Sequence, residues 1–327
     1  MFELVFLGTS ASAPSIYRGL PAVAVLAGEQ RFLVDCGEGT QRQILRSGIG
    51  FKRLNRIFLT HAHLDHILGL GGLLSTFCRW EAMDEIHIWG GLPAIQRVQA
   101  LVYQVIFRRE APPVPIYFNR VLPGKFLFRG RKFSVRAFPV SHRGRECYGY
   151  IFEEDSRRPF LADKAAALGV PHGPERTQLV AGQPIVLDNG RVVDPDEVLG
   201  DLIRGAKVVI TGDLGRTDNI SAAVRDADAL VIEATYLDAD REIASQVGHI
   251  TARQAAELAQ ACNVKQLFLT HISRRYREYE VVREARRYFP QSYVVRDLDQ
   301  FAIFRDRLPQ KLGSQRKPVE ELPPGLD

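Results

Sequence analysis

Residues 60–66, with the sequence THAHLDH, are the part of the chain best suited to chemistry. They follow an apolar run that predicts a strand, residues 56–59, and precede the helix-like run of residues 67–70. On a loop between a strand and a helix, His61 and His63 can point the same way, with Asp65 and His66 just beyond them. Neutral imidazole is a good zinc ligand, and a carboxylate adds the charge that holds a second divalent ion. The segment therefore predicts a metal site in preference to a polar turn.

Side chains from one loop cannot complete two metal sites, so further ligands must come from elsewhere. His142, Asp213 and His271 each directly follow a run that predicts a strand. In layered α/β folds, active residues gather on the loops beyond strand ends. Taken singly, each has an ordinary alternative, as a surface histidine or as an aspartate in a turn or helix cap. Because the histidine-rich loop cannot complete two metal sites alone, these three residues are the candidates for the remaining ligands.

The order of these residues resembles the metallo-β-lactamase superfamily. Within it, the chain is similar to the ribonuclease Z family on matches that extend to about Phe304. The matching segments beyond the seven candidate ligands are Phe6-Leu7-Gly8-Thr9, residues 35–40 (DCGEGT), residues 168–174 (LGVPHGP), Glu233-Ala234-Thr235, His249-x-Thr251 and residues 270–276 (THISRRY).

This resemblance implies an α/β fold, a four-layer αββα sandwich, with two zinc ions in each subunit. One zinc would be held by His61, His63 and His142, and the other by Asp65, His66 and His271, with Asp213 between them. Two cations about 3.5–4 Å apart acidify bound water and neutralise the charge that builds on phosphoryl oxygens. A hydroxide held between the metals is expected to attack phosphorus.

The resemblance also implies catalytic roles outside metal binding. Asp65 would orient the attacking water and accept its proton, His249 would protonate the leaving 3′ oxygen, and Glu233 would orient His249. The alternative for His249 is a residue at the start of a helix capped by Thr251.

The expected reaction is endonucleolytic removal of the 3′ trailer from precursor tRNA, which leaves a 3′-hydroxyl on the tRNA and a 5′-phosphate on the trailer. The resemblance also implies a homodimer. The expected substrate-binding residues are Ser273, Arg275, Tyr276, Gly173 and Pro174. Another hydrolase of the superfamily, such as a thioesterase, lactonase or arylsulfatase, is one alternative, and a metal-stabilised RNA-binding protein without turnover is a second.

Basic residues cluster near the candidate ligands. The segment from Arg97 to Arg145 contains eleven basic residues and one acidic residue, Glu110, and Arg274, Arg275 and Arg277 follow His271. The formal net charge is +5 and the sequence pI is about 9.1. One-sided charge beside a metal site suits a phosphate backbone, although a solvated basic face is the common alternative.

The elements that must position these residues belong to an ordinary globular chain of 327 residues, 46% hydrophobic and 25% charged. Short β-rich runs alternate with helical ones at both ends of the chain, which predicts two sheets with helices outside them. We expect a catalytic domain over residues 1–304. The turn-rich residues 156–196 would form an inserted substrate-binding arm, and the polar, proline-rich residues 305–327 a flexible tail.

The same sequence indicates a cytoplasmic protein. The first residues, Met1-Phe2-Glu3-Leu4, have no basic segment leading into an apolar one, so we expect no signal peptide. No apolar run approaches the ~18 residues of a membrane span. The four cysteines are scattered, and we expect them to be buried and reduced.

Overall fold

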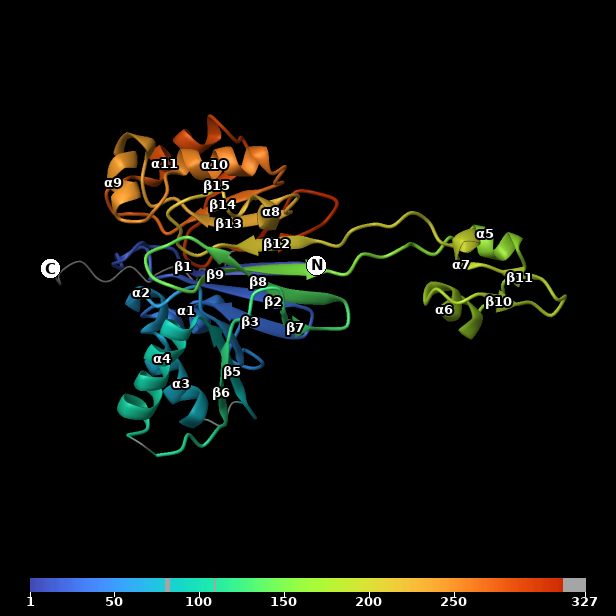
Figure 1. The fold of residues 1–327 in the computed structure, drawn as a ribbon, viewed down its shortest axis with the longest axis horizontal. Helices are drawn as coiled ribbons and strands as arrows, with labels where there is room; N and C mark the ends of the chain where they lie inside the picture. Colours follow the sequence, from blue (N-terminus) through green and yellow to red (C-terminus); the bar gives the residue numbers. More distant parts are fainter. Residues whose placement is uncertain (80–82, 109, 314–327) are drawn as a thin grey trace. The chain divides into compact units, whose positions relative to one another are not determined.

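The structure is a computed structural model that describes residues 1–79, 83–108 and 110–313. The chain divides into two compact units. The larger unit comprises Met1–Glu153 and Ala206–Asp327, and the smaller one comprises Glu154–Gly205. Within the described residues, the larger unit contains two sheets with helices beside them (Figure 1).

The first sheet has the strand order β17-β16-β1-β2-β3-β4-β5-β6. Strands β3 to β6 run parallel to one another, and the remaining neighbours are antiparallel. The bounds of its strands are β1 Phe2–Gly8, β2 Ala22–Ala27, β3 Gln30–Val34, β4 Arg56–Phe58, β5 Ile86–Gly90, β6 Ile116–Arg120, β16 Gln300–Ile303 and β17 Gln310–Leu312.

The second sheet has the order β15-β14-β13-β12-β9-β8-β7, in which β12 to β15 are parallel. Its strands are β7 Phe126–Arg129, β8 Phe133–Val140, β9 Cys147–Glu154, β12 Lys207–Ile210, β13 Ala229–Glu233, β14 Leu267–Thr270 and β15 Ser292–Val294. Because parallel strands end at the same edge of a sheet, residues that follow β12, β13 and β14 are brought together.

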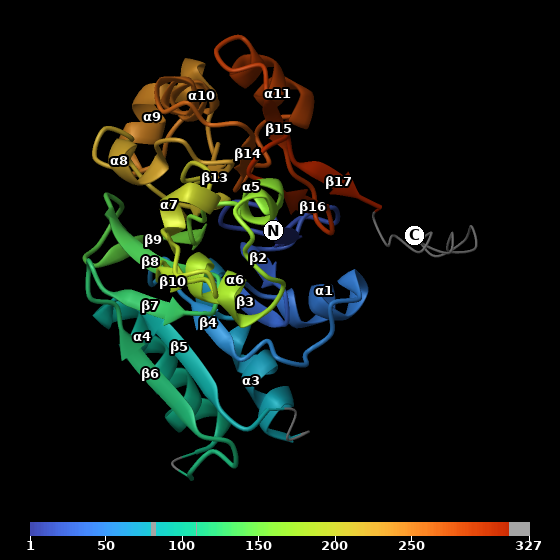
Figure 2. The same ribbon diagram turned by 90° about the vertical axis from the view of Figure 1, so that its right-hand side faces the viewer.

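Helices cover the outer face of each sheet, and both views show the early helices beside the first sheet and the late ones beside the second (Figures 1 and 2). On the first sheet these are α1 Thr40–Ser47, α2 Leu64–Ile67, α3 Leu70–Arg79, α4 Leu92–Ala100 and the π-helical turn η1 Leu101–Ile106. On the second they are α8 Ser221–Val224, η2 Asp238–Asp240, α9 Arg241–Gln246, α10 Ala252–Ala261 and α11 Glu278–Arg286. For the described residues, the predicted αββα sandwich is confirmed.

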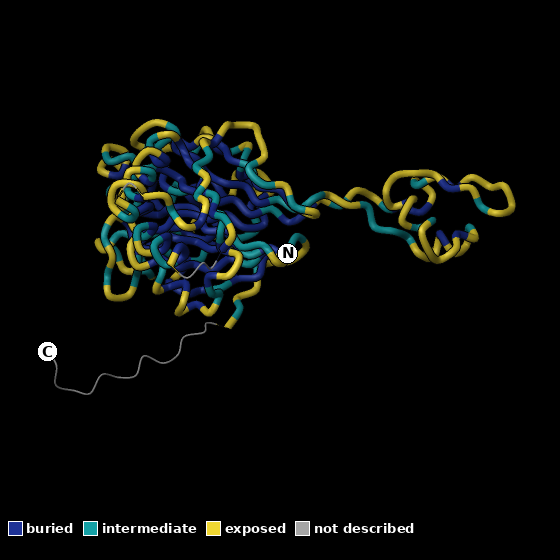
Figure 3. The backbone as a smooth tube through the Cα atoms, turned by 90° about the horizontal axis from the view of Figure 1, so that it is seen from below, coloured by how far each residue is buried: buried dark blue, intermediate teal, exposed yellow. Residues whose placement is uncertain are grey.

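The pattern of apolar residues explains the layers. In β1, Phe2, Leu4 and Phe6 join the core between the two sheets, whereas Val5 and Leu7 join the core beneath the helices. Both faces of the strand are therefore buried, which is why its sequence is almost continuously apolar. In Figure 3 the strands of the larger unit are mostly buried, and its exposed residues lie on outer helices and loops.

The smaller unit has its own core, formed by Ala165, Val170, Leu179, Ile185, Val193 and Val198. Its elements are α5 Ala162–Ala167, α6 Pro174–Val180, β10 Ile185–Val186, β11 Val192–Val193 and α7 Pro195–Val198. The unit is folded rather than a run of turns, because its apolar residues are numerous enough to bury one another. The predicted arm of residues 156–196 lies inside it, and its role in substrate binding stays a prediction.

We expected a flexible tail over residues 305–327, but part of this segment forms a strand. Gln310–Leu312 forms β17, which pairs with β16. Lys311 lies 2.8 Å from the buried carboxylate of Asp299 and contacts the ring of Tyr293, so a polar segment gains partners that its composition does not reveal. Residues 314–327 lie outside the described residues.

Two further expectations concern membrane spans and the cysteines. In the described part of the chain, no helix is both long enough and apolar enough to cross a membrane. The four cysteines are buried and form no disulfide, as expected.

Candidate metal centre

The structure brings all the predicted metal ligands to one edge of the sandwich. His61 follows β4, His63 is the N-cap of α2, and Asp65 and His66 lie in the first turn of that helix. The remaining ligands follow strands of the second sheet: His142 after β8, Asp213 after β12 and His271 after β14.

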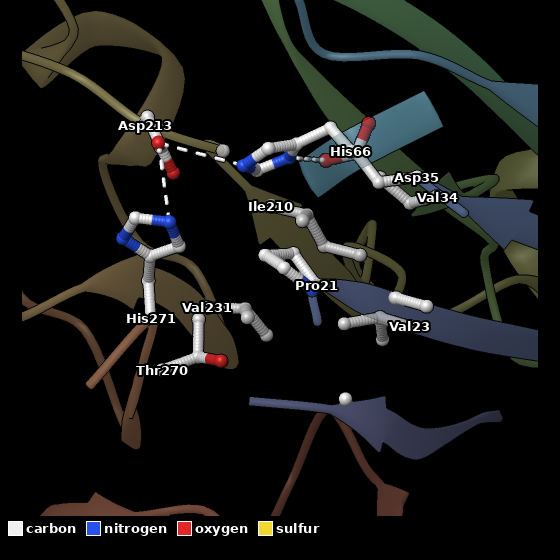
Figure 4. Close-up of a pocket in the computed structure, with 13 residues that line it drawn as sticks. Pro21, Val23, Val34, Asp35, His66, Ile210, Asp213, Val231, Thr270 and His271 are labelled. Atoms are coloured by element: carbon white, nitrogen blue, oxygen red, sulfur yellow. Dashed lines mark hydrogen bonds and ion pairs between the residues drawn. The ribbon is translucent and has the colours of Figure 1, made fainter. Parts of the chain in front are cut away.

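The ligand atoms form two groups, each with atoms within 4.8 Å of one another: His61, His63, His142 and Asp213 in one, and Asp65, His66 and His271 in the other. Asp213 Oδ2 lies between the groups. It is 3.8 Å from His61 Nε2 and 4.0 Å from His142 Nε2 on one side, and 3.4 Å from His66 Nε2 and 3.3 Å from His271 Nε2 on the other (Figure 4). A carboxylate in this place can bridge two cations.

Buried ring nitrogens without hydrogen-bond partners fit a metal centre. Among the described residues, the buried Nε2 atoms of His61, His66 and His271 make no hydrogen bond. A buried polar atom without a partner is costly, and here three of them face the carboxylates of Asp65 and Asp213. Lone pairs gathered in this way are what a divalent cation requires. The residues therefore fit the expected metals.

The opposite ring nitrogens are occupied, and these partners set the tautomers. His66 Nδ1 donates to Asp35 at 2.7 Å, and His142 Nδ1 donates to the carbonyl of Gly248 at 2.7 Å. His61 Nδ1 donates to Thr60 Oγ1 at 3.0 Å, because the hydroxyl proton of Thr60 is given to Asp35. In the neutral ring, each of these hydrogen bonds keeps the proton on Nδ1 and leaves the Nε2 lone pair facing the site, the arrangement that metal-binding histidines usually show. Burial opposes protonation of His66, but the carboxylates of Asp213 and Asp35 outweigh it and raise the pKa of His66 well above its ordinary value, so a cation that binds there displaces a proton.

Asp35 is a functional residue that our sequence analysis did not assign. It accepts from the backbone N–H of Thr60 at 2.8 Å and from its hydroxyl at 2.7 Å, in addition to His66. It thus orients His66 directly and His61 through Thr60. The signal was present in the sequence: Asp35 follows β3, the parallel neighbour of the strand that leads to His61.

Glu233 connects the remaining parts of the site. Its buried carboxylate accepts from the backbone N–H of Leu214, next to Asp213, at 2.8 Å. It also accepts from Thr235 Oγ1, which in turn accepts from His271 Nδ1 at 2.8 Å. His249 Nδ1 lies 3.0 Å from both of its oxygens. Glu233 therefore holds both His249 and a metal-ligand histidine.

The histidines of the site differ in the direction of their pKa shifts. Burial lowers the pKa of His61, His63 and His142, so these rings are neutral and free to bind a cation. Burial also opposes protonation of His249, but the carboxylate of Glu233 outweighs it and raises the pKa of His249 to about 9. For Asp65, burial raises the pKa, but interactions with His271 and His66 outweigh it and lower the value to about 2.

Backbone geometry at the site is specialised. Asp35 and His271 both have positive φ angles, of 60° and 55°, which are uncommon outside glycine and cluster at functional sites. Gly37 packs against the ligand-bearing helix, since a Cβ at this position would lie 2.4 Å from the carbonyl oxygen of Asp65. Figure 4 shows Val23, Ile210 and Val231 of the inter-sheet core beneath the cluster.

A cleft of about 660 Å³ opens over the metal ligands. It is lined by residues from several loops of the larger unit: Ala11, Ser12 and Ala13; His63 and Asp65; Arg143; Asp213; Thr235 and Tyr236; Val247 and His249; and Ser273, Arg274 and Arg275. The arginines make it suited to a phosphate backbone.

The predicted substrate residues divide into three sets. Ser273 and Arg275 line the cleft. Tyr276 does not line it; its hydroxyl donates to Asp240, and its ring lies edge-on to Tyr236, a residue that does line the cleft. Gly173 and Pro174 lie in the smaller unit, at the N-cap and first position of α6.

The position of His249 allows a second assignment. Its side chain is 12% exposed, and its ring packs against His271 and His142, with ring centroids 5.4 and 5.2 Å apart. One of its ring nitrogens lies within 4.8 Å of ligand atoms of Asp213 and His271. The residue is therefore placed either to donate a proton into the cleft or to bind a metal.

Comparison with known proteins gives a consistent result over nearly the whole chain. Residues 18–118 match the Metallo-beta-lactamase superfamily, and residues 175–272 match the Beta-lactamase superfamily domain. The chain is 47% identical to Ribonuclease Z of Bradyrhizobium diazoefficiens over 303 residues, which cover 93% of this chain and 100% of that protein. It is 38% identical to Ribonuclease Z of Gemmatimonas aurantiaca over 295 residues, covering 89% and 93%.

A solved structure agrees with these relatives. The crystal structure of the short form of human tRNase Z superimposes with a TM-score of 0.64 at 26% sequence identity, and the match covers 92% of this chain and 99% of that one.

Proposed function

Because this chain belongs to the ribonuclease Z family of the metallo-β-lactamase superfamily, we propose that it is a hydrolase that removes the 3′ trailer from precursor tRNA by an endonucleolytic cut. The observation that carries the proposal is a histidine and aspartate cluster with metal-ligand geometry at the floor of an arginine-lined cleft. A polyanionic substrate needs those arginines, whereas a small neutral ester does not.

Two zinc ions are the proposed cofactors, held by His61, His63 and His142 at one position and by Asp65, His66 and His271 at the other, with Asp213 shared. Bound there, divalent cations would activate water and neutralise the charge that develops on the phosphoryl oxygens. Imidazole and carboxylate ligands in these proportions suit zinc.

The protein side chains supply the proton transfers. Asp65 lines the cleft and is ionised, so it can orient the attacking water and take its proton. Attack at phosphorus breaks the bond to the 3′ oxygen. His249, fixed through Nδ1 by Glu233, can give that oxygen a proton from Nε2. The products are a tRNA with a 3′-hydroxyl and a trailer with a 5′-phosphate.

We further propose that the enzyme works as a homodimer in the cytoplasm. Exposed apolar side chains on α2 and its C-cap, Leu64 (54% exposed) and Leu68 (45%), lie one turn apart. A second copy would cover such residues. Light scattering should give twice the chain mass of 36.7 kDa.

The activity is tested by incubating the zinc-loaded protein with a tRNA precursor that carries a 3′ trailer and mapping the cut by end labelling. A single cut at the 3′ end of the tRNA body supports the proposal. Parallel assays with thioesters, lactones and aryl sulfates address the other hydrolases of the superfamily, and turnover of those compounds without RNA cleavage would replace the assignment. Binding of the precursor without any cleavage, even in a single turnover, would indicate an RNA-binding protein.

A further inference from the structure

The loop Thr9–Gly19 presents two large apolar side chains to solvent. Ile16 is 90% exposed and Tyr17 is 82% exposed, more than any other large hydrophobic residue in the described part of the chain. Single exposed apolar residues are common and need no explanation. The hydrogen bonds of this loop and its position in the fold instead indicate that the pair is a contact surface.

The tip of the loop is held by its own hydrogen bonds. Ser15 N–H donates to the carbonyl of Arg18 at 2.8 Å, and Ser15 Oγ accepts from Arg18 N–H at 3.0 Å and Tyr17 N–H at 3.2 Å. Ile16 and Tyr17 therefore sit on a closed turn. Their exposure is fixed by the backbone, so it costs little entropy to use them as a contact surface.

Arg18 ties this turn to the body of the protein. Its mostly buried guanidinium donates to Thr9 Oγ1 at 2.7 Å and to the carbonyl of Val295 at 2.6 Å, and it pairs with Glu278 at 3.0 Å. Glu278 is the first residue of α11 and directly follows the basic segment that contains Arg274 and Arg275.

The loop also forms part of the cleft wall. Ala11, Ser12 and Ala13 line the cleft together with Ser273 and the two arginines. Ser10 pairs with Ile272, and the N–H of Ala11 donates to the Ile272 carbonyl at 3.1 Å. The loop is thus fastened to the residue after His271, and Ile16 and Tyr17 follow closely after the three loop residues that line the cleft with the arginines.

We propose that Tyr17, supported by Ile16, stacks on an unpaired nucleobase next to the scissile phosphate. The inference rests on the proposed function and adds a base contact to it. Single-stranded RNA is bound by aromatic rings that stack on bases beside basic groups that meet the backbone. An exposed tyrosine held on a closed turn, in a loop whose preceding residues line an arginine-containing cleft, supplies that combination. The contact is sequence-tolerant, since every base has a π face.

The test uses the full-length, zinc-loaded protein with a trailer-bearing tRNA precursor. Tyr17→Ala should raise KM about 5- to 150-fold, the range expected for loss of one base stack, with a smaller change in kcat. Tyr17→Phe and Tyr17→Trp should keep KM near that of the unmodified protein, since a ring without the hydroxyl still stacks. Tyr117→Ala, at a 47% exposed tyrosine of β6 outside the cleft lining, is the matched control and should leave KM as in the unmodified protein.

Substrates with a single abasic nucleotide identify the base that is contacted. Removing the stacked base should raise KM for the unmodified enzyme and add nothing further in Tyr17→Ala, because the two changes remove the same interaction. The proposal would be overturned if Tyr17→Ala and the abasic nucleotide raised KM independently of each other at every nucleotide position tested. An unchanged KM in a Tyr17→Ala variant that keeps its thermal unfolding midpoint would also overturn it, as would a shift of the monomer–dimer equilibrium as the main effect. In these cases the unmodified enzyme still cuts the precursor, whereas failure of the proposed function would abolish that cut.

Discussion

Replacing Asp35 by Asn should weaken zinc binding about 10- to 100-fold, the usual effect of removing an outer partner of metal-bound histidines. Asp35 accepts from His66 Nδ1 and twice from Thr60. Asparagine has one acceptor oxygen, and its amide group must face one of these donors. The change also removes the negative charge that makes His66 a better ligand.

The expected loss lies toward the upper end of that range, because the effect reaches both metal positions. His66 belongs to one ligand group, and His61, oriented by Thr60, belongs to the other. The buried donor left without a partner should also lower the free energy of unfolding by about 1–3 kcal/mol. Zinc affinity is measured by competition with a chromogenic chelator, and the unfolding free energy by urea titration of the metal-free protein.

Asp299→Asn is the control for general destabilisation. Asp299 is also buried, accepts from Arg296 N–H at 2.9 Å and pairs with Lys311, but it touches none of the candidate ligands. It should lower stability and leave zinc affinity unchanged. Zinc affinity in Asp35→Asn equal to that of the unmodified protein would refute the orienting role. Equal losses of affinity in the two variants would show that the effect comes from instability alone.

Other changes test the remaining parts of the site. His63→Ala should remove metal and activity while far-ultraviolet circular dichroism stays unchanged, and turnover as in the unmodified protein in metal-controlled buffer would refute its assignment. His249→Ala should lower kcat for precursor tRNA about 10²–10⁴-fold but affect a p-nitrophenyl leaving group less, with two zinc ions retained by elemental analysis; loss of one zinc would make it a ligand. Replacing residues 155–204 by a short Gly-Ser linker should abolish precursor tRNA cleavage, mainly through KM, and preserve hydrolysis of bis(p-nitrophenyl) phosphate. The linker can be short because Glu154 and Gly205 are in contact, and precursor cleavage as in the unmodified protein would exclude a substrate role for the smaller unit.

The ligand cluster could be predicted from the sequence because each ligand follows a strand. His142, Asp213 and His271 lie far apart in the chain, yet each comes directly after an apolar run. Parallel strands place their C-terminal ends side by side, which brings Asp213 and His271 together after β12 and β14. His142 follows β8, outside the parallel strands, and was a candidate because the histidine-rich loop needs further ligands. The αββα layering followed in the same way from the alternation of strand and helix runs.

The residues that orient the ligands could not be assigned in this way. Thr235 and Glu233 were visible as a motif, but only the structure shows that Thr235 bonds His271. Such contacts depend on side-chain direction at bonding distance, which spacing does not determine. The fold of the smaller unit and the pairing of β17 were missed for a related reason: short polar and turn-rich segments gain order from partners remote in sequence.

The division of the ligands between the sheets links metal binding to closure of the sandwich. The His61 loop leaves the first sheet, but β9 of the second sheet holds it: Tyr150 donates to the carbonyl of Leu59 at 2.5 Å, and Tyr148 N–H donates to that of Thr60 at 2.8 Å. The two halves meet where Gly212, with a φ of 66°, packs on Thr60, and a Cβ there would lie 2.6 Å from the threonine. Neither sheet alone presents a complete set around Asp213. Bound zinc should therefore stabilise the packing of one sheet on the other, since a ligand that binds only the closed form adds its binding free energy to that of folding.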